Sequence, residues 1–165
     1  SPEGRFQGTM IAFVSAALSL AATQGRPIVI DVPVKLTEAD VVFNIMSRGP
    51  IPARQNSLFL AKTMTGVLAA DGTPRKIVAI FHSAAAALAC SDAAFNRLTG
   101  TTAGNPYKAR IAELQRDGVQ TEICVKSMEF QKIAKSELLP GVKVNGGALI
   151  RVVELTQQGY TQLTF

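Results

Sequence analysis

The chain has few of the residues from which metal centres, disulfide frameworks and nucleic-acid surfaces are built. Its 165 residues include one histidine, two cysteines, two tyrosines and no tryptophan. The spacing of Cys90 and Cys124 defines neither a zinc site nor a disulfide framework, and a single histidine leaves little for another metal. The net charge of +5 is moderate, and the basic residues are scattered with few aromatic rings to stack on bases. We therefore expect no metal site and no nucleic-acid partner.

The chain also lacks the common phosphate-binding and hydrolase motifs. It contains no G-x-G-x-x-G, no P-loop, no G-x-S-x-G and no Cys-x-x-Cys sequence. No motif therefore indicates a dinucleotide enzyme, a nucleotide triphosphatase or a serine hydrolase. We expect no cofactor. The composition, with 47% hydrophobic and 18% charged residues, instead indicates a compact domain with a core of its own.

An apolar run at residues 10–22, after Arg5, sets the first part of the chain apart. It is too short to span a bilayer comfortably, so we expect no stable membrane span. Its length and composition are typical of the hydrophobic region of a signal peptide, which would place the protein in the periplasm. The alternative is a packing helix on the domain or on a neighbouring subunit of a cytoplasmic protein. We divide the chain into an apolar N-terminal segment, residues 1–26, and a single α/β domain, residues 27–165.

Segments with strand character alternate with segments of helical character along this domain. Such alternation predicts a mostly parallel sheet of about five strands with helices on both faces, in a flavodoxin-like three-layer sandwich. Pro33 confines the first strand-like segment to a sheet edge or an extended arm. The predicted strands are residues 28–34, 41–45, 76–82, 119–124, 142–145 and 160–165. The predicted helices are residues 55–70, 91–98, a helix opened by Asn105-Pro106, residues 127–135, and a helix opened by Gly146-Gly147.

Three side chains end predicted strands on what would be the same edge of the sheet: Asn44, His82 and Cys124. In open α/β sheets, ligands bind outside the carboxyl ends of the strands. A thiol just before a helix, with Lys126 two residues on, is in a setting that lowers its pKa. The Gly146-Gly147 backbone offers amides to an anion. Together these groups suit nucleophilic sulfur chemistry, with His82 as the base that keeps the thiol ionised.

Each of these residues also has a purely structural interpretation. Free cysteine is among the most buried residue types, so Cys124 can be a core residue. His82 can be a polar strand end that hydrogen-bonds a loop, and Gly146-Gly147 can allow close packing of a helix on a strand. For the two glycines the packing interpretation is favoured.

Four further residues receive structural assignments. Cys90, beside an alanine-rich segment, is expected to be packed rather than reactive. Ser127, in the sequence Cys124-Val125-Lys126-Ser127, is expected to cap a helix. Glu122 and Arg151 are assigned to solvated faces.

Several stretches together resemble the DsrE/DsrF-like family of sulfur-relay proteins, in an exported or uncharacterised branch. The resemblance runs from about Val32 to Phe165. Its strongest parts are Gly118-Val119 leading to Cys124, and the stretch from Leu138 to Ala148. Further support comes from Val34-Lys35-Leu36 through Val41-Val42-Phe43-Asn44, Phe81-His82 and Gly104-Asn105-Pro106-Tyr107-Lys108.

The resemblance implies a flavodoxin-like fold that assembles into homo-oligomers, either trimers or hexamers. It also implies that a cysteine in the position of Cys124 carries a persulfide, which passes from a sulfur-donor protein to an acceptor protein. His82 and Asn105 match residues typical of the branch. We therefore expect Cys124 and His82 to be catalytic, and Asn44, Asn105 and Gly146-Gly147 to bind substrate.

Three hypotheses follow. The first is a sulfur carrier, or sulfurtransferase-type protein, that uses Cys124 as a persulfide-bearing nucleophile; whether it is an enzyme is left open. The second is a non-catalytic oligomeric module that binds a small ligand, with Cys124 only lining the crevice. The third is a redox role in which Cys124 pairs with Cys90, which requires Cα atoms within about 7 Å.

Overall fold

The fold is seen in a computed structural model of the chain, in which residues 28–48 and 57–164 are described. The apolar segment, residues 1–26, lies outside the described residues, and both interpretations of it stay predictions. Residues 28–34 contain no strand and are exposed. Asp31 and Val32 form a bend, and Pro33 has no N–H for a strand ladder, so the prediction of an edge strand is wrong, whereas the alternative of an extended arm stays a prediction. Lys35–Phe165 forms one compact unit.

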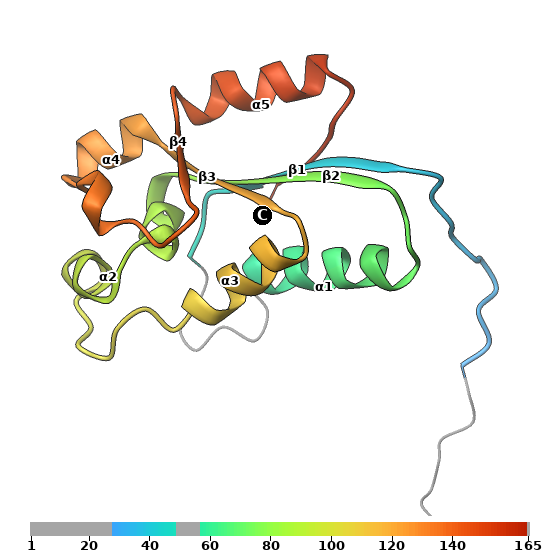
Figure 1. Ribbon diagram of the computed structural model, residues 1–165, viewed down its shortest axis with the longest axis horizontal. Helices are drawn as coiled ribbons and strands as arrows, with labels where there is room; N and C mark the ends of the chain where they lie inside the picture. Colours follow the sequence, from blue (N-terminus) through green and yellow to red (C-terminus); the bar gives the residue numbers. More distant parts are fainter. Residues whose placement is uncertain (1–27, 49–56, 165) are drawn as a thin grey trace, which may run out of the picture. The chain divides into compact units, whose positions relative to one another are not determined.

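This unit is built on a five-stranded, fully parallel sheet with the order β4-β3-β2-β1-β5. The sheet, the element types and their alternation confirm the predicted α/β sandwich (Figure 1). The strands are β1 Ala39–Ile45, β2 Arg75–Phe81, β3 Gln120–Cys124, β4 Lys143–Asn145 and β5 Thr161–Thr164. The helices are α1 Ser57–Ala70, η1 Ser83–Ala89, α2 Asp92–Thr99, α3 Lys108–Arg116, α4 Val125–Gln131, η2 Lys135–Glu137 and α5 Ala148–Gln157.

Alternate residues of the central strands enter two separate apolar clusters, one on each face of the sheet. In β1, Val41 and Phe43 belong to the larger cluster, under α1 and α3, whereas Val42 belongs to the smaller cluster, under α5. Figure 1 shows α1 and α3 on one side of the sheet and α5 on the other. Because helices cover both faces, these strands are apolar throughout, as is usual for a parallel sheet. Among the helices of the described residues, none combines the length and apolar character needed to cross a membrane.

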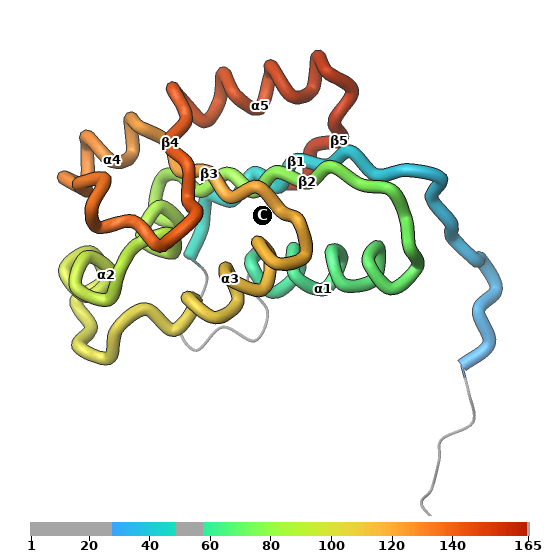
Figure 2. Tube along the Cα trace, viewed as in Figure 1, coloured from blue at the N-terminus to red at the C-terminus, as the bar shows by residue number. Residues whose placement is uncertain are grey.

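The chain changes direction after β4. From β1 to β4 each strand adds beside the one before it, and α5 then carries the chain back across the sheet to β5, beside β1 (Figure 2). Met128 of α4 packs in the larger cluster, and Ala148 of α5 packs in the smaller one. The connections that leave β3 and β4 therefore diverge to opposite faces. In open α/β sheets this divergence creates a crevice at the carboxyl ends of the strands.

Two predicted helix boundaries are wrong. The helix predicted over residues 127–135 begins at Val125, directly after the strand, and ends at Gln131, because Lys132 adopts a left-handed conformation with φ 53°. The helix predicted to open at Asn105-Pro106 begins at Lys108. The Asn105 side chain accepts a hydrogen bond from the Tyr107 amide at 2.9 Å in the turn before this helix. The start of α4 matters for the candidate site because Cys124 is the residue directly before it.

Candidate functional site

A cavity of about 900 Å³ opens at the carboxyl ends of β2, β3 and β4. It brings together four of the predicted site residues, namely His82, Cys124, Gly146 and Gly147. Its remaining lining comes from the start of η1, from α4 and from the first turn of α5: Ser83, Ala84, Lys126, Ser127, Phe130, Gln131, Ala148, Leu149 and Ile150. The cavity therefore lies where the strand order predicts a ligand site.

Cys124 is the last residue of β3 and the residue before α4. It is 5% exposed, yet it lines the cavity. The Ala148 amide, the first of α5, donates a hydrogen bond to the Cys124 Sγ at 3.3 Å. The thiol thus sits between the starts of two helices, and the helix dipole favours negative charge at such a position.

The surroundings of Cys124 favour its thiolate. Burial by itself raises the pKa of the thiol, but interactions with the Ala148, Ser127 and Lys126 amides and with the Ser127 hydroxyl outweigh burial and lower the pKa below its ordinary value. The Ala148 amide donates a hydrogen bond to the sulfur at 3.3 Å. A lowered pKa is the property that makes a cysteine nucleophilic at neutral pH.

Ser127 joins the thiol to the start of η1. Its Oγ accepts a hydrogen bond from the Ser83 amide at 3.0 Å, which leaves the hydroxyl hydrogen for the sulfur. Ser83 has a positive φ of 52°, and its carbonyl accepts a hydrogen bond from Gln131 at 2.7 Å. The prediction that Ser127 caps a helix is wrong, because Cys124 is the residue before α4 and Ser127 is the third residue of that helix. The Cys-x-x-Ser spacing is the feature of the sequence that marks Ser127.

His82 follows β2 and is held by two hydrogen bonds. Its Nε2 lies 2.7 Å from Asn44 Oδ1, and its Nδ1 lies 3.3 Å from Ser83 Oγ. Because an amide oxygen only accepts, Nε2 carries the proton and Nδ1 accepts from the serine hydroxyl. Asn44 in turn donates to Thr164 Oγ1 at 3.5 Å. Burial lowers the pKa of His82, so its neutral form is favoured.

His82 and Cys124 share the cavity, but the described contacts include no hydrogen bond between them. The groups that favour the thiolate are the amides and the Ser127 hydroxyl rather than an imidazolium. The prediction that His82 keeps the thiol ionised stays a prediction. Asn44 reaches the site through His82 and is not itself among the residues that line the cavity.

Gly146 and Gly147 line the cavity between β4 and α5. A Cβ atom added to either glycine would meet nothing within 4 Å, so the favoured interpretation of close helix–strand packing is wrong. Gly147 has φ 156°, a backbone conformation that is costly for residues with a side chain. Its amide donates to Asn145 Oδ1 at 3.1 Å, which directs the next amide, that of Ala148, toward Cys124.

Asn105 is not among the residues that line the cavity. Its Nδ2 donates to the carbonyl oxygens of Leu88 and Cys90 at 2.9 and 2.7 Å. These bonds give Asn105 a structural role in tying the turn before α3 to the end of η1. Its predicted role in substrate binding stays a prediction.

Cys90 and Cys124 are both free, and they belong to the two different apolar clusters. Burial, with a smaller contribution from the nearby Glu137 carboxylate, raises the pKa of Cys90 to about 11. Its Sγ donates to the Ala86 carbonyl at 3.4 Å. Cys90 is a packed thiol, as its surroundings in the sequence indicate, and its placement gives the redox hypothesis no support.

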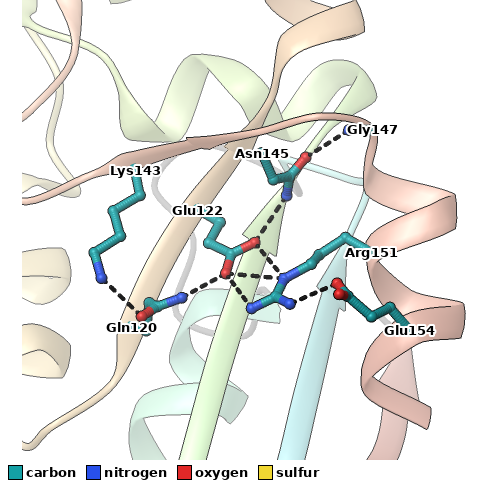
Figure 3. A network of polar contacts seen from close by, with 7 residues as sticks. All are labelled: Gln120, Glu122, Lys143, Asn145, Gly147, Arg151 and Glu154. Carbon is teal, nitrogen blue, oxygen red and sulfur yellow. Dashed lines mark hydrogen bonds and ion pairs between the residues drawn. The ribbon is translucent and has the colours of Figure 1, made fainter. Parts of the chain in front are cut away.

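Glu122 and Arg151 were assigned to solvated faces, and this assignment is wrong. Glu122 is 3% exposed, and its carboxylate pairs with the Arg151 guanidinium at 3.0 Å. Figure 3 shows this pair at the centre of a polar network between β3, β4 and α5. Alternation along β3 directs Glu122 away from the larger cluster, but α5 covers that face, so the side chain is not in solvent.

Three of the apolar side chains that line the cavity are largely exposed, and we call them its apolar rim: Phe130 at 89%, Leu149 at 66% and Ile150 at 76%. Phe130 belongs to α4, and Leu149 and Ile150 belong to the first turn of α5. Across the described part of the chain, no cluster of three His, Cys, Asp or Glu side chains is arranged to hold a metal ion. The site thus combines one activated thiol, backbone amides and an apolar rim.

Two solved structures are similar to this chain, and the first of them supports the fold. Among solved structures, MTH1491 from Methanobacterium thermoautotrophicum, a protein of unknown function, is 19% identical with a TM-score of 0.62, over 78% of this chain and 100% of that one. The ychN protein from E. coli is 20% identical with a TM-score of 0.49, over 78% of this chain and 99% of that one. No curated protein matches the chain.

At this identity, the likeness to MTH1491 concerns the fold alone. The family model described as the DsrE/DsrF-like family matches residues 40–165. This range includes every residue that lines the cavity and all five strands except the first residue of β1, Ala39. The chain belongs to the DsrE/DsrF-like family.

Proposed function

We propose that the protein is a sulfur carrier in which Cys124 bears a persulfide. The observation that carries the proposal is a thiol of lowered pKa that lines a cavity of about 900 Å³ and accepts a hydrogen bond from the Ala148 amide. Membership of a family generally related to sulfur relay supports the same chemistry. Asn44, Asn105 and Gly146 are not needed for the chemistry in this proposal.

The transfer needs no external oxidant or reductant. The Cys124 thiolate attacks the terminal sulfur of a donor persulfide, R–S–SH. A new S–S bond forms at Cys124 as the S–S bond of the donor breaks, and the donor leaves as a thiolate that takes up a proton. An acceptor thiolate then attacks the terminal sulfur of the Cys124 persulfide and restores the Cys124 thiolate. The amides that lower the pKa of the thiol also favour Cys124 as a leaving group in this second step.

The exposed apolar rim supports protein partners. Phe130, Leu149 and Ile150 line the cavity and are largely exposed, and exposed apolar clusters of this kind are typical of interaction sites. In this proposal a donor and an acceptor protein approach the thiol across the rim, and the chain works as a homo-oligomer, a trimer or a hexamer. The proposed periplasmic location rests on residues 10–22, outside the described residues.

Mass spectrometry of the intact protein tests the proposal. After incubation with a sulfane-sulfur donor, the wild type should gain one sulfur that a reductant removes, and Cys124→Ser should gain none. Cys90→Ser is the matched control, and it should load sulfur like the wild type because the Cys90 thiol is buried with a pKa of about 11. Wild-type protein that gains no sulfur, or loading that persists in Cys124→Ser, would contradict a carrier role for Cys124.

A second candidate function is a small-ligand-binding module. The observation in its favour is that Cys124 is only 5% exposed in a cavity with several apolar lining residues. In that case Cys124→Ser should leave ligand binding intact, and the wild type should take up no sulfur. The same pair of proteins therefore distinguishes the two functions.

A further inference from the structure

The Glu122 carboxylate is surrounded by hydrogen-bond donors. Gln120 Nε2 donates to Oε1 at 2.6 Å, and Asn145 Nδ2 donates to Oε2 at 3.0 Å. Arg151 binds both oxygens, with Nε 3.2 Å from each and Nη2 3.0 Å from Oε1. Figure 3 shows the carboxylate at the point where β3, β4 and α5 meet. Gln120, Asn145 and Arg151 all donate to the carboxylate, which therefore joins the three elements.

This cluster lies next to the thiol on both elements that hold it. Glu122 is two residues before Cys124 on β3, so the two side chains share one face of the strand; Ile123 between them packs on the opposite face. On α5, Arg151 is three residues after Ala148 and therefore lies on the same side of the helix. The contacts Glu122–Arg151 and Cys124–Ala148 are thus two parallel links between β3 and the first turn of α5.

The loop between the two elements is fixed by the same carboxylate. Asn145 lies beside Cys124 in the sheet register. Its Nδ2 binds Glu122 at 3.0 Å, and its Oδ1 accepts from the Gly147 amide at 3.1 Å. The amide that follows Gly147 is the one that reaches the sulfur. Glu122 therefore controls the position of that amide through two routes, one by Arg151 and one by Asn145.

We infer that Glu122, Arg151 and Asn145 are positioning residues that hold the first turn of α5 against Cys124. A buried ion pair is a poor source of net stability, because desolvation offsets the attraction, and its use is often to fix one geometry. Here the geometry that it fixes is the Ala148 N–H···Sγ contact. The inference concerns the thiol used in the proposed function, and it rests on that function only for the thiol's use in sulfur transfer.

A positioning role of Glu122 and a simple effect of its charge shift the pKa of the Cys124 thiol in opposite directions, so an experiment can distinguish them. The charged groups around Cys124 are Glu122 on β3, Arg151 on α5 and Lys126 on α4, with the titratable His82 after β2. Removal of the Glu122 negative charge would by Coulomb's law favour the thiolate and lower the thiol pKa. Loss of the positioned amide disfavours the thiolate and raises the thiol pKa.

Glu122→Gln is the sharpest variant. Both carboxylate oxygens accept from donors, so the NH₂ group of glutamine faces a donor in either orientation of the amide. The pH dependence of the alkylation rate with iodoacetamide gives the thiol pKa, in a Cys90→Ala background that leaves Cys124 as the single cysteine. We expect a threefold to tenfold slower reaction at pH 7, on the order of the loss of one hydrogen bond to a thiolate. The limiting rate at high pH should not fall, because a thiolate of higher pKa is intrinsically at least as nucleophilic.

Two further variants keep the test decisive. Glu154→Gln removes an exposed carboxylate that binds the outer side of Arg151 at 2.7 Å, and it should leave the thiol pKa unchanged. If Glu122→Gln does not fold, Arg151→Lys keeps the positive charge but loses the fork that binds both oxygens, and it should raise the thiol pKa in the same direction. Circular dichroism and urea unfolding establish that each variant is folded.

A folded Glu122→Gln or Arg151→Lys protein with an unchanged or lowered thiol pKa would overturn the inference. Iodoacetamide needs no sulfur donor, so this result is independent of sulfur loading. A wild type that takes up no sulfur, together with a raised thiol pKa in the variant, would remove the proposed function and leave the positioning role. A wild type that takes up sulfur, together with an unshifted thiol pKa in the variant, would leave the proposed function and remove the positioning role.

Discussion

The Ala148 amide donates to the Cys124 sulfur across 3.3 Å and so links the start of α5 to the end of β3. The two residues are 24 positions apart in the sequence. They meet because β4 pairs beside β3 and α5 begins directly after the glycines that follow β4. The activation of the thiol is therefore a property of the β4–α5 junction as much as of the strand that carries the cysteine.

Gly147→Ala tests this junction. At φ 156°, a residue with a side chain is strained, so we expect the variant to lose about 1–3 kcal/mol of unfolding free energy or to relax the junction. Relaxation moves the Ala148 amide and raises the pKa of the Cys124 thiol. Urea unfolding measures the first effect, and the alkylation rate as a function of pH measures the second.

Gly146→Ala is the matched control for Gly147→Ala. Gly146 is also open to the cavity, with nothing within 4 Å of an added Cβ atom, but it is not among the residues with positive φ. We expect its unfolding free energy to stay within about 0.5 kcal/mol of the wild type. Equal losses in the two variants would mean that the backbone conformation of Gly147 does not matter.

The sequence was sufficient to place Cys124 and His82 at one edge of the sheet. Both residues follow apolar strands, and parallel strands separated by helices direct their carboxyl ends to the same edge. The strand–helix alternation also predicts the layers and the parallel sheet. A hydrophobic run of five to seven residues between two helices can bury its side chains in few arrangements other than a strand of such a sheet. These inferences depend on local patterns alone.

The partners of those residues could not be predicted in the same way. The alternation that separates Ile123 from Glu122 says which side chains share a face, but not what covers that face. Arg151, which pairs with Glu122, is 29 residues away, and its contact depends on the crossing of α5 to the second face of the sheet. The Ala148 amide is a backbone group with no signature in the sequence. Contacts between distant elements require the topology first.

His82 predicts a pH dependence of stability. Burial lowers its pKa in the folded state, whereas the unfolded chain has the ordinary histidine pKa of about 6.5. As the pH falls below that value, the unfolded state takes up a proton more readily than the folded state, so the unfolding free energy falls. The decline should begin near pH 6.5, level off below the folded pKa, and not exceed about 1.4 kcal/mol per pH unit.

His82→Gln provides the control for this pH dependence. Between about pH 7 and pH 5 the carboxyl groups still keep their charge, because their ordinary pKa values lie near 4. The difference in unfolding free energy between the wild type and His82→Gln should therefore change with pH over this window. Urea unfolding at several pH values measures it. Parallel pH curves for the two proteins would mean that burial does not shift the titration of His82.

Asn105→Ala separates a structural role from a role in binding. Nδ2 donates to the carbonyls of Leu88 and Cys90 and Oδ1 accepts from the Tyr107 amide, all in a buried setting where an unpaired backbone group is costly. We expect a loss of about 2–4 kcal/mol of unfolding free energy, because several buried hydrogen bonds disappear together. In the fraction that remains folded, Cys124 should take up sulfur at the wild-type rate, since the Asn105 side chain is not among those that line the cavity.

Gln162→Ala is the comparison for this last variant. Its amide donates to Thr164 Oγ1 at 2.8 Å in an exposed setting, where water replaces a lost partner, so the unfolding free energy should change by less than about 0.5 kcal/mol. Urea unfolding and intact-mass measurement of sulfur uptake are made on both proteins. A stable Asn105→Ala protein that no longer takes up sulfur would instead support the substrate-binding role predicted for Asn105, and the contacts to Leu88 and Cys90 would then be secondary.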